Sequence, residues 1–217
     1  MTFKTQNKVE IDWNQDFAYI IGVIASDGCL AKNNSYVRFN QKDRELVENV
    51  KEGLNLDNKI SYYSPKDRDV GWYRFEFGDR NFCEFLISIG IESNKSNTIE
   101  KVDVPTQYFP DFCRGLFDGD GSFCSRWDKR RPSSFRFTTA FASASKPFIE
   151  WLETKLKKLY SLTGSNRKGD HVFRLTYEKK ATLKLFDIMY HSDNLLFLTR
   201  KHDKMIKAFK KDPHLEF

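Results

Sequence analysis

The chain has 217 residues, of which 40% are hydrophobic and 30% are charged, and this balance is typical of a globular protein with a sizeable core. It contains no apolar run near the roughly 20 residues that cross a bilayer, and its polar first residues lack the apolar core of a signal peptide. We therefore expect an intracellular protein with no membrane partner. The net charge of +6 favours a polyanionic partner, although a mildly basic soluble protein would show the same value.

The cysteines argue against a zinc site and against disulfides. The four cysteines, Cys29, Cys83, Cys113 and Cys124, form no C-x-x-C pair, which disfavours a zinc site. A disulfide is disfavoured in a reducing compartment. We expect four small, semi-buried thiols.

The chain contains an internal repeat, with the same order of predicted elements in each half. Asp27-Gly28 recurs as Asp120-Gly121, and Gly22 recurs as Gly115. Around these motifs each half is predicted to run helix, two strands, helix, two strands, helix. The first half has a helix after the N-cap Asn14, a strand at 36–41, a helix at 43–54, strands at 59–64 and 72–77, and a helix at 80–90. The second half has a helix from Pro110, a strand at 135–143, a helix at 146–159, strands at 163–168 and 171–177, and a helix at 179–190.

The predicted strands alternate between apolar and polar side chains. Val37 and Phe39 point to one face, while Tyr36, Arg38 and Asn40 point to the other. An antiparallel sheet can cover its apolar face with helices and leave the polar face free. A free polar face is ordinary for a surface sheet, but two such faces in a duplicated basic chain favour a saddle for a long polyanion.

The first helix of each half carries a stripe of mostly small residues. Because Ala18, Gly22 and Ala25 fall on one side of the first helix, we expect them to contact the matching stripe of the second, which is Asp111, Gly115 and Asp118. Small residues allow two helix backbones to approach closely. Each stripe would alternatively pack on the sheet of its own half.

If the two helices cross at Gly22 and Gly115, their C-terminal ends come together. Asp27 and Asp120 would then lie side by side. Carboxylates are unfavourable at helix C-termini and repel one another, so folding alone gives no reason for the pair. Mg²⁺ gives one, because it takes one or two carboxylates and completes its shell with water and phosphate oxygens. The carbonyl groups of Ser26 and Gly119 are further candidate ligands. The alternative is that each Asp-Gly only makes the turn from helix to strand.

The two motifs, "IIGVIASDG" at 20–28 and "CRGLFDGDG" at 113–121, resemble those of the LAGLIDADG homing endonucleases. The first departs from the family pattern at Ala25, where the family has an acid. The resemblance runs from about residue 16 to residue 204 and implies a monomeric, pseudo-symmetric α+β protein. Its fold would be a duplicated αββαββα unit with two antiparallel saddle sheets and a central two-helix interface. The half-domains would be residues 1–104 and 105–217.

The resemblance also implies roles for individual residues. Asp27 and Asp120 would bind the catalytic metal, while Asp118 matches a packing or capping position. Polar and basic residues near the acids would order water and stabilise the transition state, and these are Gln41, Lys42, Lys95 and Lys201. The stretch 142–145 in the second half offers only Ser143 for this role. Sheet faces and a basic hairpin tip would contact DNA through Tyr36, Arg38, Asn40, Tyr63, Lys66, Arg68, Trp72, Arg74, Arg126, Lys129, Arg130, Arg131, Arg136, Thr138, Arg167, Lys168 and Arg174.

The implied function is that of a site-specific double-strand DNA endonuclease of the intron-homing type. Each half would hydrolyse one phosphodiester in an asymmetric target of about 20 base pairs, leaving four-base 3′ overhangs, with no protein partner required. Mg²⁺ or Mn²⁺ would support cleavage, and Ca²⁺ would bind without supporting it.

Three other functions compete with this interpretation. A maturase-like splicing cofactor or regulator would keep the fold and lose cleavage, but such proteins often lose an acid, and both acids are present here. An intein is disfavoured because the chain neither starts with Cys or Ser nor ends with His-Asn. A plain α/β scaffold leaves the duplicated Asp-Gly helix ends without a role.

Overall fold

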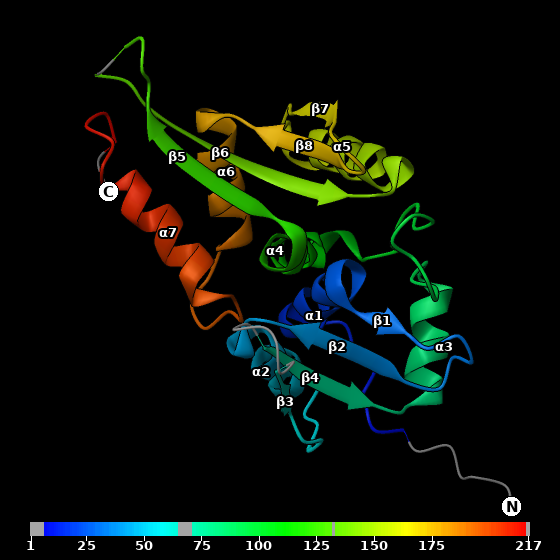
Figure 1. Ribbon diagram of the computed structural model, residues 1–217. Coiled ribbons are helices and arrows are strands. Elements are labelled where there is room, and N and C mark those ends of the chain that lie inside the picture. The colour runs from blue at the N-terminus through cyan, green and yellow to red at the C-terminus, as the bar shows by residue number, and fades with distance from the viewer. Residues whose placement is uncertain (1–6, 65–70, 132, 216–217) are drawn as a thin grey trace, which may run out of the picture.

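The computed structural model describes residues 7–64, 71–131 and 133–215, and it shows two halves of the same architecture (Figure 1). The first half comprises α1 (Gln15–Asp27), β1 (Cys29–Leu30), β2 (Val37–Gln41), α2 (Arg44–Gly53), β3 (Ser61–Tyr63), β4 (Trp72–Phe77) and α3 (Arg80–Ser88). The second half comprises the short 3₁₀ helix η1 (Thr106–Tyr108), then α4 (Phe109–Asp120), β5 (Ser122–Trp127), β6 (Phe135–Ser143), α5 (Lys146–Tyr160), β7 (Ser165–Lys168), β8 (Phe173–Tyr177), α6 (Lys179–Met189) and α7 (Thr199–Phe209).

Each half contains one antiparallel four-stranded sheet. The strand orders are β1-β2-β4-β3 and β5-β6-β8-β7, so the two sheets have equivalent topology. In the register, Phe39 lies opposite Phe75 and Phe141 lies opposite Leu175, and all four side chains are buried. The expected α+β class and duplicated αββαββα order are confirmed, with α7 added at the end of the second half.

Local residue chemistry sets the ends of the elements. Asn14 caps α1 by accepting a hydrogen bond from the Phe17 amide at 2.8 Å. The helix expected from Pro110 starts one residue earlier, with the proline in its first turn. The strand expected from 171 starts instead at Phe173, because His171 has a φ of 62°. That left-handed conformation belongs to a turn and cannot continue a strand.

Helices α1 and α4 cross at the centre of the molecule with backbone contact at two glycines (Figure 1). A Cβ added at Gly22 would lie 2.2 Å from the Phe112 carbonyl oxygen, and one added at Gly115 would lie 2.0 Å from the Tyr19 carbonyl oxygen. Ala18 and Ala25 are buried on the same helix. The two glycines of the repeat therefore meet at one interface between α1 and α4, and the contact of the other members of each stripe across this interface stays a prediction.

The acidic members of the α4 stripe are buried and hydrogen-bonded. Asp118 accepts from the Tyr19 hydroxyl of α1 at 3.0 Å and from the Leu198 amide at 2.7 Å. Burial raises the pKa of Asp118 to about 6. Asp111 pairs with the fully buried Arg114 at 2.8 Å. Asp118 thus links α4 to α1 and to the segment before α7, whereas the Asp111–Arg114 pair lies within α4 itself.

No helix within the described ranges has both the length and the apolarity needed to cross a bilayer.

Replacing Gly115 with alanine tests the close crossing. Alanine in a helix normally stabilises by about 1 kcal/mol relative to glycine. Here the added methyl group meets backbone, which cannot move without separating α1 from α4, so we expect Gly115→Ala to lower the free energy of unfolding by at least about 2 kcal/mol. Urea unfolding followed by circular dichroism measures the change.

Gly169→Ala is the matched control for this substitution, because its Cβ would lie 3.5 Å from the Val172 carbonyl oxygen, an ordinary contact. An equal effect of the two substitutions, or a more stable Gly115→Ala protein, would contradict the close crossing.

Candidate active site and nucleic-acid interface

The C-terminal ends of α1 and α4 bring Asp27 and Asp120 together. Burial raises the pKa of Asp27 to about 6, and the nearby charge of Asp120 adds to this rise. A hydrogen bond from Gln41 and the charges of two lysines act in the opposite direction. Burial also raises the pKa of Asp120, with Lys95 and Lys201 opposing it. Asp27 therefore lies within range of the charge of Asp120, in a partly desolvated site.

The side chain of Asp27 reaches across to the other half. A Cβ at Gly119 of α4 would lie 2.5 Å from the Asp27 Oδ2 atom and 1.9 Å from the Ser26 hydroxyl oxygen. Ser26 also donates to Asp27 Oδ2 at 3.4 Å. Glycine at 119 thus leaves the space that the Asp27 carboxylate occupies. Glycine is needed at this position because the side chains of α1 approach closely, and not because the backbone adopts an unusual φ.

Lys95 and Lys201 lie near Asp27 and Asp120, and they cap the C-terminal ends of the helices that carry these acids. Lys95 is buried and donates to the carbonyl oxygens of Gly28 and, at 3.4 Å, Ser26. Lys201 donates to four carbonyl oxygens at the end of α4, between 2.6 and 3.0 Å away. A cation at a helix C-terminus satisfies its free carbonyl groups and offsets its negative end. Burial lowers the pKa of both lysines, that of Lys201 to about 8.

The carbonyl groups expected as metal ligands already have partners. Ser26 O accepts from Lys95 at 3.4 Å, and Gly119 O accepts from Lys201 at 3.0 Å. A carbonyl oxygen has a second lone pair, so each group keeps one acceptor site. Their role as ligands stays a prediction.

The ends of β2 and β6 differ between the halves. Gln41 is the last residue of β2 and hydrogen-bonds to Asp27, and the next residue, Lys42, is exposed. The equivalent position on β6 is Ser143, whose hydroxyl accepts from the Ser145 amide at 3.1 Å. Polar support from a strand end thus reaches Asp27, while the short residues at 142–144 leave space beside Asp120.

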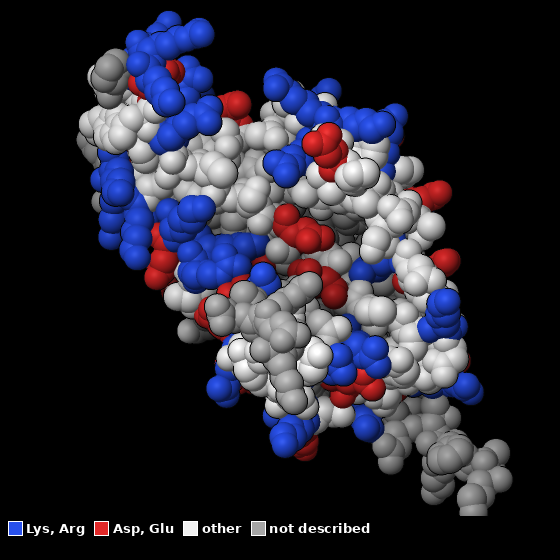
Figure 2. All heavy atoms as spheres, in the orientation of Figure 1, with Lys and Arg blue, Asp and Glu red and all other residues white. Residues whose placement is uncertain are grey.

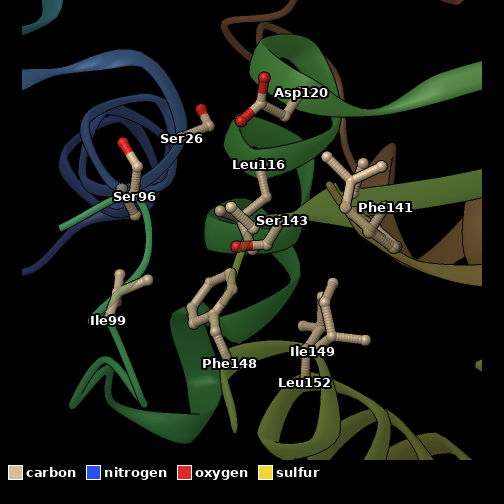
Figure 3. A pocket seen from close by; sticks show the side chains of 14 residues that line it. Ser26, Ser96, Ile99, Leu116, Asp120, Phe141, Ser143, Phe148, Ile149 and Leu152 are labelled. Carbon is tan, nitrogen blue, oxygen red and sulfur yellow. The ribbon is translucent and has the colours of Figure 1, made fainter. Parts of the chain in front are cut away.

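That space is a pocket of about 220 Å³ which the sequence analysis did not foresee. Figure 3 shows Ser26 and Asp120 at its rim, where α1 and α4 end, and Phe148, Ile149 and Leu152 of α5 at its far side. The small residues of "ASAS" at 142–145 were the available sequence signal.

The pair of acids fits a hard divalent cation. Across the described ranges, no group of three or more His, Cys, Asp or Glu side chains is placed to hold a metal. Zinc and iron sites need such sets, whereas Mg²⁺ and Mn²⁺ use one or two carboxylates together with water and phosphate oxygens. The donor chemistry of Asp27 and Asp120 therefore suits a metal that also binds a phosphate-containing substrate.

Candidate DNA-contacting residues lie on both sheets and on the hairpin between β5 and β6. Arg38 pairs with Glu76 and stacks over the Tyr36 ring at 5.1 Å, and Arg74 donates to Asn40 at 3.0 Å. These contacts hold the polar face of the first sheet in order. Tyr63 on β3 is 57% exposed, and Trp72 on β4 is partly exposed. Lys66 and Arg68 lie outside the described residues.

On the second sheet, several cationic side chains lie close together on neighbouring strands. Arg167 and Arg174 lie directly opposite each other on β7 and β8, an arrangement that is unfavourable unless an anion lies near. Arg136 pairs with Asp128 at 2.6 Å near the hairpin tip. The remaining candidates are exposed or partly exposed on this sheet and tip, and they are Arg126, Lys129, Arg130, Arg131, Thr138 and Lys168. Figure 2 shows basic groups around a face whose hollowed centre holds acidic groups.

Comparison with known proteins supports the resemblance seen in the motifs. Residues 14–90 match the family model of the LAGLIDADG-like domain. A search of curated proteins found no match. The fold is similar to that of the homing endonuclease I-WcaI bound to its DNA recognition sequence, with a TM-score of 0.62, 14% identity, and coverage of 89% of this chain and 88% of that one.

Two other solved structures share this fold. I-DmoI in complex with DNA and Mn has a TM-score of 0.53 and 18% identity, over 82% of this chain and 97% of that one. Full-length DUF199/WhiA from Thermatoga maritima has a TM-score of 0.60 and 12% identity, over 96% of this chain. The match spans 64% of the length of the WhiA chain. The chain thus has the LAGLIDADG fold, with a LAGLIDADG-like domain in its first half.

The raised pKa of Asp27 predicts a pH-dependent cost to folding. Its folded-state pKa of about 6 lies above the ordinary value of 3.8. The cost is therefore absent below about pH 4 and complete above about pH 6. With metal removed by chelator, we expect Asp27→Asn to be more stable than wild type at pH 7.5, by on the order of 1–2 kcal/mol. The difference should vanish near pH 4, as measured by urea unfolding across the pH range.

Asp43→Asn provides the matched control with the opposite sign, because a hydrogen bond from Arg200 lowers the pKa of Asp43. Its stability contribution is present at neutral pH and lost as the pH falls, so this variant should be less stable than wild type at pH 7.5. A difference for Asp27→Asn that does not change with pH would contradict the desolvated site.

Proposed function

We propose that this protein is a divalent-metal-dependent, site-specific endonuclease that cuts both strands of duplex DNA. The observation that carries the proposal is the pair of acids, Asp27 and Asp120, at adjacent C-terminal ends of crossing helices. The pair is costly to the fold and suits a metal that binds phosphate. The LAGLIDADG fold, which is shared with DNA-bound homing endonucleases, supports the same assignment.

In this proposal the half-domains, residues 1–104 and 105–217, each supply one acid and act on one strand. Asp27 and Asp120 would hold Mg²⁺ or Mn²⁺, which supplies Lewis-acid stabilisation of the leaving 3′-oxygen and activates water. Gln41 fixes the orientation of the Asp27 carboxylate through its hydrogen bond. Lys95 and Lys201 hold the ends of α1 and α4 and add positive charge beneath the scissile phosphates. Lys42, which follows Gln41 in the chain and is exposed, would contact the substrate.

Binding would use the polar faces of the two sheets, because an antiparallel ribbon fits the major groove. The two sheets carry different residues on their polar faces, so the target would be asymmetric. The saddle would cover about 20 base pairs of duplex. The family resemblance implies that the cuts would leave four-base 3′ overhangs. A single chain carries both acids, so a monomer suffices.

The second candidate is a nucleic-acid-binding protein that does not cleave, such as a splicing maturase. The fold is shared with WhiA as well as with homing endonucleases, so fold alone does not choose between binding and cleavage. The two acids favour cleavage, because a binding protein gains nothing from them.

A cleavage selection tests this proposal. Randomised duplex DNA is incubated with Mg²⁺ and either wild type or the Asp27→Asn, Asp120→Asn double variant, and cut ends are sequenced. We expect one long asymmetric site with recessed 5′ ends, recovered only with wild type. Enrichment of bound DNA or RNA by both proteins without any cut site would favour the binding protein instead.

Single replacement of Asp120 separates chemistry from binding. Asp120→Asn removes a metal ligand and leaves the sheet faces intact, so cleavage of the selected duplex should fall by more than about 100-fold. Duplex affinity measured in Ca²⁺ should change by less than about three-fold, since sheet contacts dominate it. Affinity lost in parallel with cleavage would show that Asp120 maintains the fold or binds DNA directly.

A further inference from the structure

A stripe of basic side chains runs along α7, outside both sheets. Arg200, Lys204 and Lys207 follow one another at i, i+4 and i+7 and therefore share one side of the helix. Lys211 continues the stripe just beyond the helix end, where its amide donates to the Ala208 carbonyl oxygen at 3.1 Å. The opposite side of α7 packs into the core through Met205 and its buried neighbours.

The stripe is more than the solvated side of an amphipathic helix. Such sides normally carry charges of both signs, whereas α7 has one acid, Asp203, which flanks the stripe four residues before Lys207 and is outnumbered by its cations. Two members are structurally engaged: Arg200 pairs with Asp43 at 2.9 Å, and Lys204 donates to the Phe123 carbonyl oxygen at 2.7 Å. The side chains of Lys207 and Lys211 are exposed, and neither forms an ion pair or hydrogen bond with a described residue.

The contacts of α7 fix its position along the edge of the second sheet. Lys204 ties the helix to β5, the outer strand of the second sheet, and Arg200 ties its start to the first half. Figure 1 shows α7 running beside β5 toward the hairpin tip. In the same orientation, Figure 2 shows basic side chains along this edge, on the face whose centre holds acidic groups. The helix that carries the stripe thus lies along the edge of the second sheet, between the first half and the hairpin tip.

The dimensions of the stripe match a DNA strand. The helical rise of about 1.5 Å per residue places Arg200 and Lys211 roughly 16 Å apart along the axis. One DNA strand carries a phosphate for every 3.4 Å or so of duplex, so the stripe is long enough to lie beside about five phosphates. Its lysines are point charges without bidentate geometry, which suits backbone contact and not base readout.

We propose that the α7 stripe, Arg200, Lys204, Lys207 and Lys211, binds the phosphate backbone of one strand of duplex DNA at the edge of the second sheet. This inference rests on the proposed function, because it adds a binding surface to the same DNA site. In the first half, the segment that carries Lys95 forms turns at 93–98 in place of a helix. The added grip is therefore one-sided, and it strengthens binding to any sequence on the side of the C-terminal half.

A matched pair of double variants tests the proposal. Lys207→Gln, Lys211→Gln removes two charges from the stripe. Lys180→Gln, Lys184→Gln removes two charges with the same i, i+4 spacing from the exposed side of α6, which packs on the apolar face of the second sheet through Thr182. Both changes leave the acids and sheet faces untouched. Unfolding midpoints of the two variants establish that each is folded.

The readout is the affinity for a fluorescein-labelled duplex of mixed sequence, measured by anisotropy in Ca²⁺ over a series of salt concentrations. Each lost phosphate contact removes about 0.9 from the slope of log K against log salt. The stripe variant should thus lose about 1.8 from the slope and at least about five-fold in affinity near 0.1 M salt. The α6 variant should match wild type.

Three results would overturn the inference. An unchanged slope for the stripe variant, while wild type binds duplex, would remove α7 from the interface and leave the proposed function intact. Equal losses in both variants would show an effect of net charge and not of a surface. Failure of wild type itself to bind duplex would overturn the inference together with the proposed function.

Discussion

The backbone contact between α1 and α4 is the constraint on which the rest of the structure depends. Gly22 and Gly115 let two helices meet with no side chain between them, and this closeness brings their C-terminal ends to one place. The main features of the site follow from that geometry: Asp27 reaches across to Gly119, the charge of Asp120 raises the pKa of Asp27, and the halves place their sheets on either side of the pair. A larger residue at either glycine would separate the acids as well as weaken the core.

The site contains two carboxylates whose positions are electrostatically unfavourable, and two buried lysines offset part of this cost. Two carboxylates sit at negative helix ends, partly removed from water. Lys95 and Lys201 reduce this cost because they donate hydrogen bonds to the free carbonyl groups of the same helix ends. The lysines neutralise the helix termini without forming a direct ion pair with either acid among the described contacts. A protein selected only for stability would gain from losing both acids, and this is the physical reason to infer a function for them.

Much of this arrangement could be read from the sequence, because it depends on local periodicity and on a repeat. The alternation at 36–41 identified the buried face of β2, and the paired Asp-Gly motifs with their upstream glycines identified the helix crossing. The start of β8 was misplaced, because a left-handed His171 carries no strong signal in a stretch of strand-forming residues. The capping bonds of Lys95 and Lys201 depend on loops that fold back over long separations, so their proximity to the acids came only from the family resemblance. The pocket beside Asp120 and the position of the α7 stripe are tertiary properties, since they depend on which elements pack together and not on spacing along the chain.

The most direct test of the central claim is whether the paired acids bind a divalent metal. Electron paramagnetic resonance of free Mn²⁺, titrated into protein with a mixed-sequence duplex, reports how much metal each protein takes up beyond that bound by DNA alone. The account predicts saturable uptake by wild type that the Asp27→Asn, Asp120→Asn double variant lacks, while both proteins retain duplex binding. Equal uptake by the two proteins would contradict it, because the metal would then be held elsewhere and the crossing of α1 and α4 would have brought the acids together for another reason.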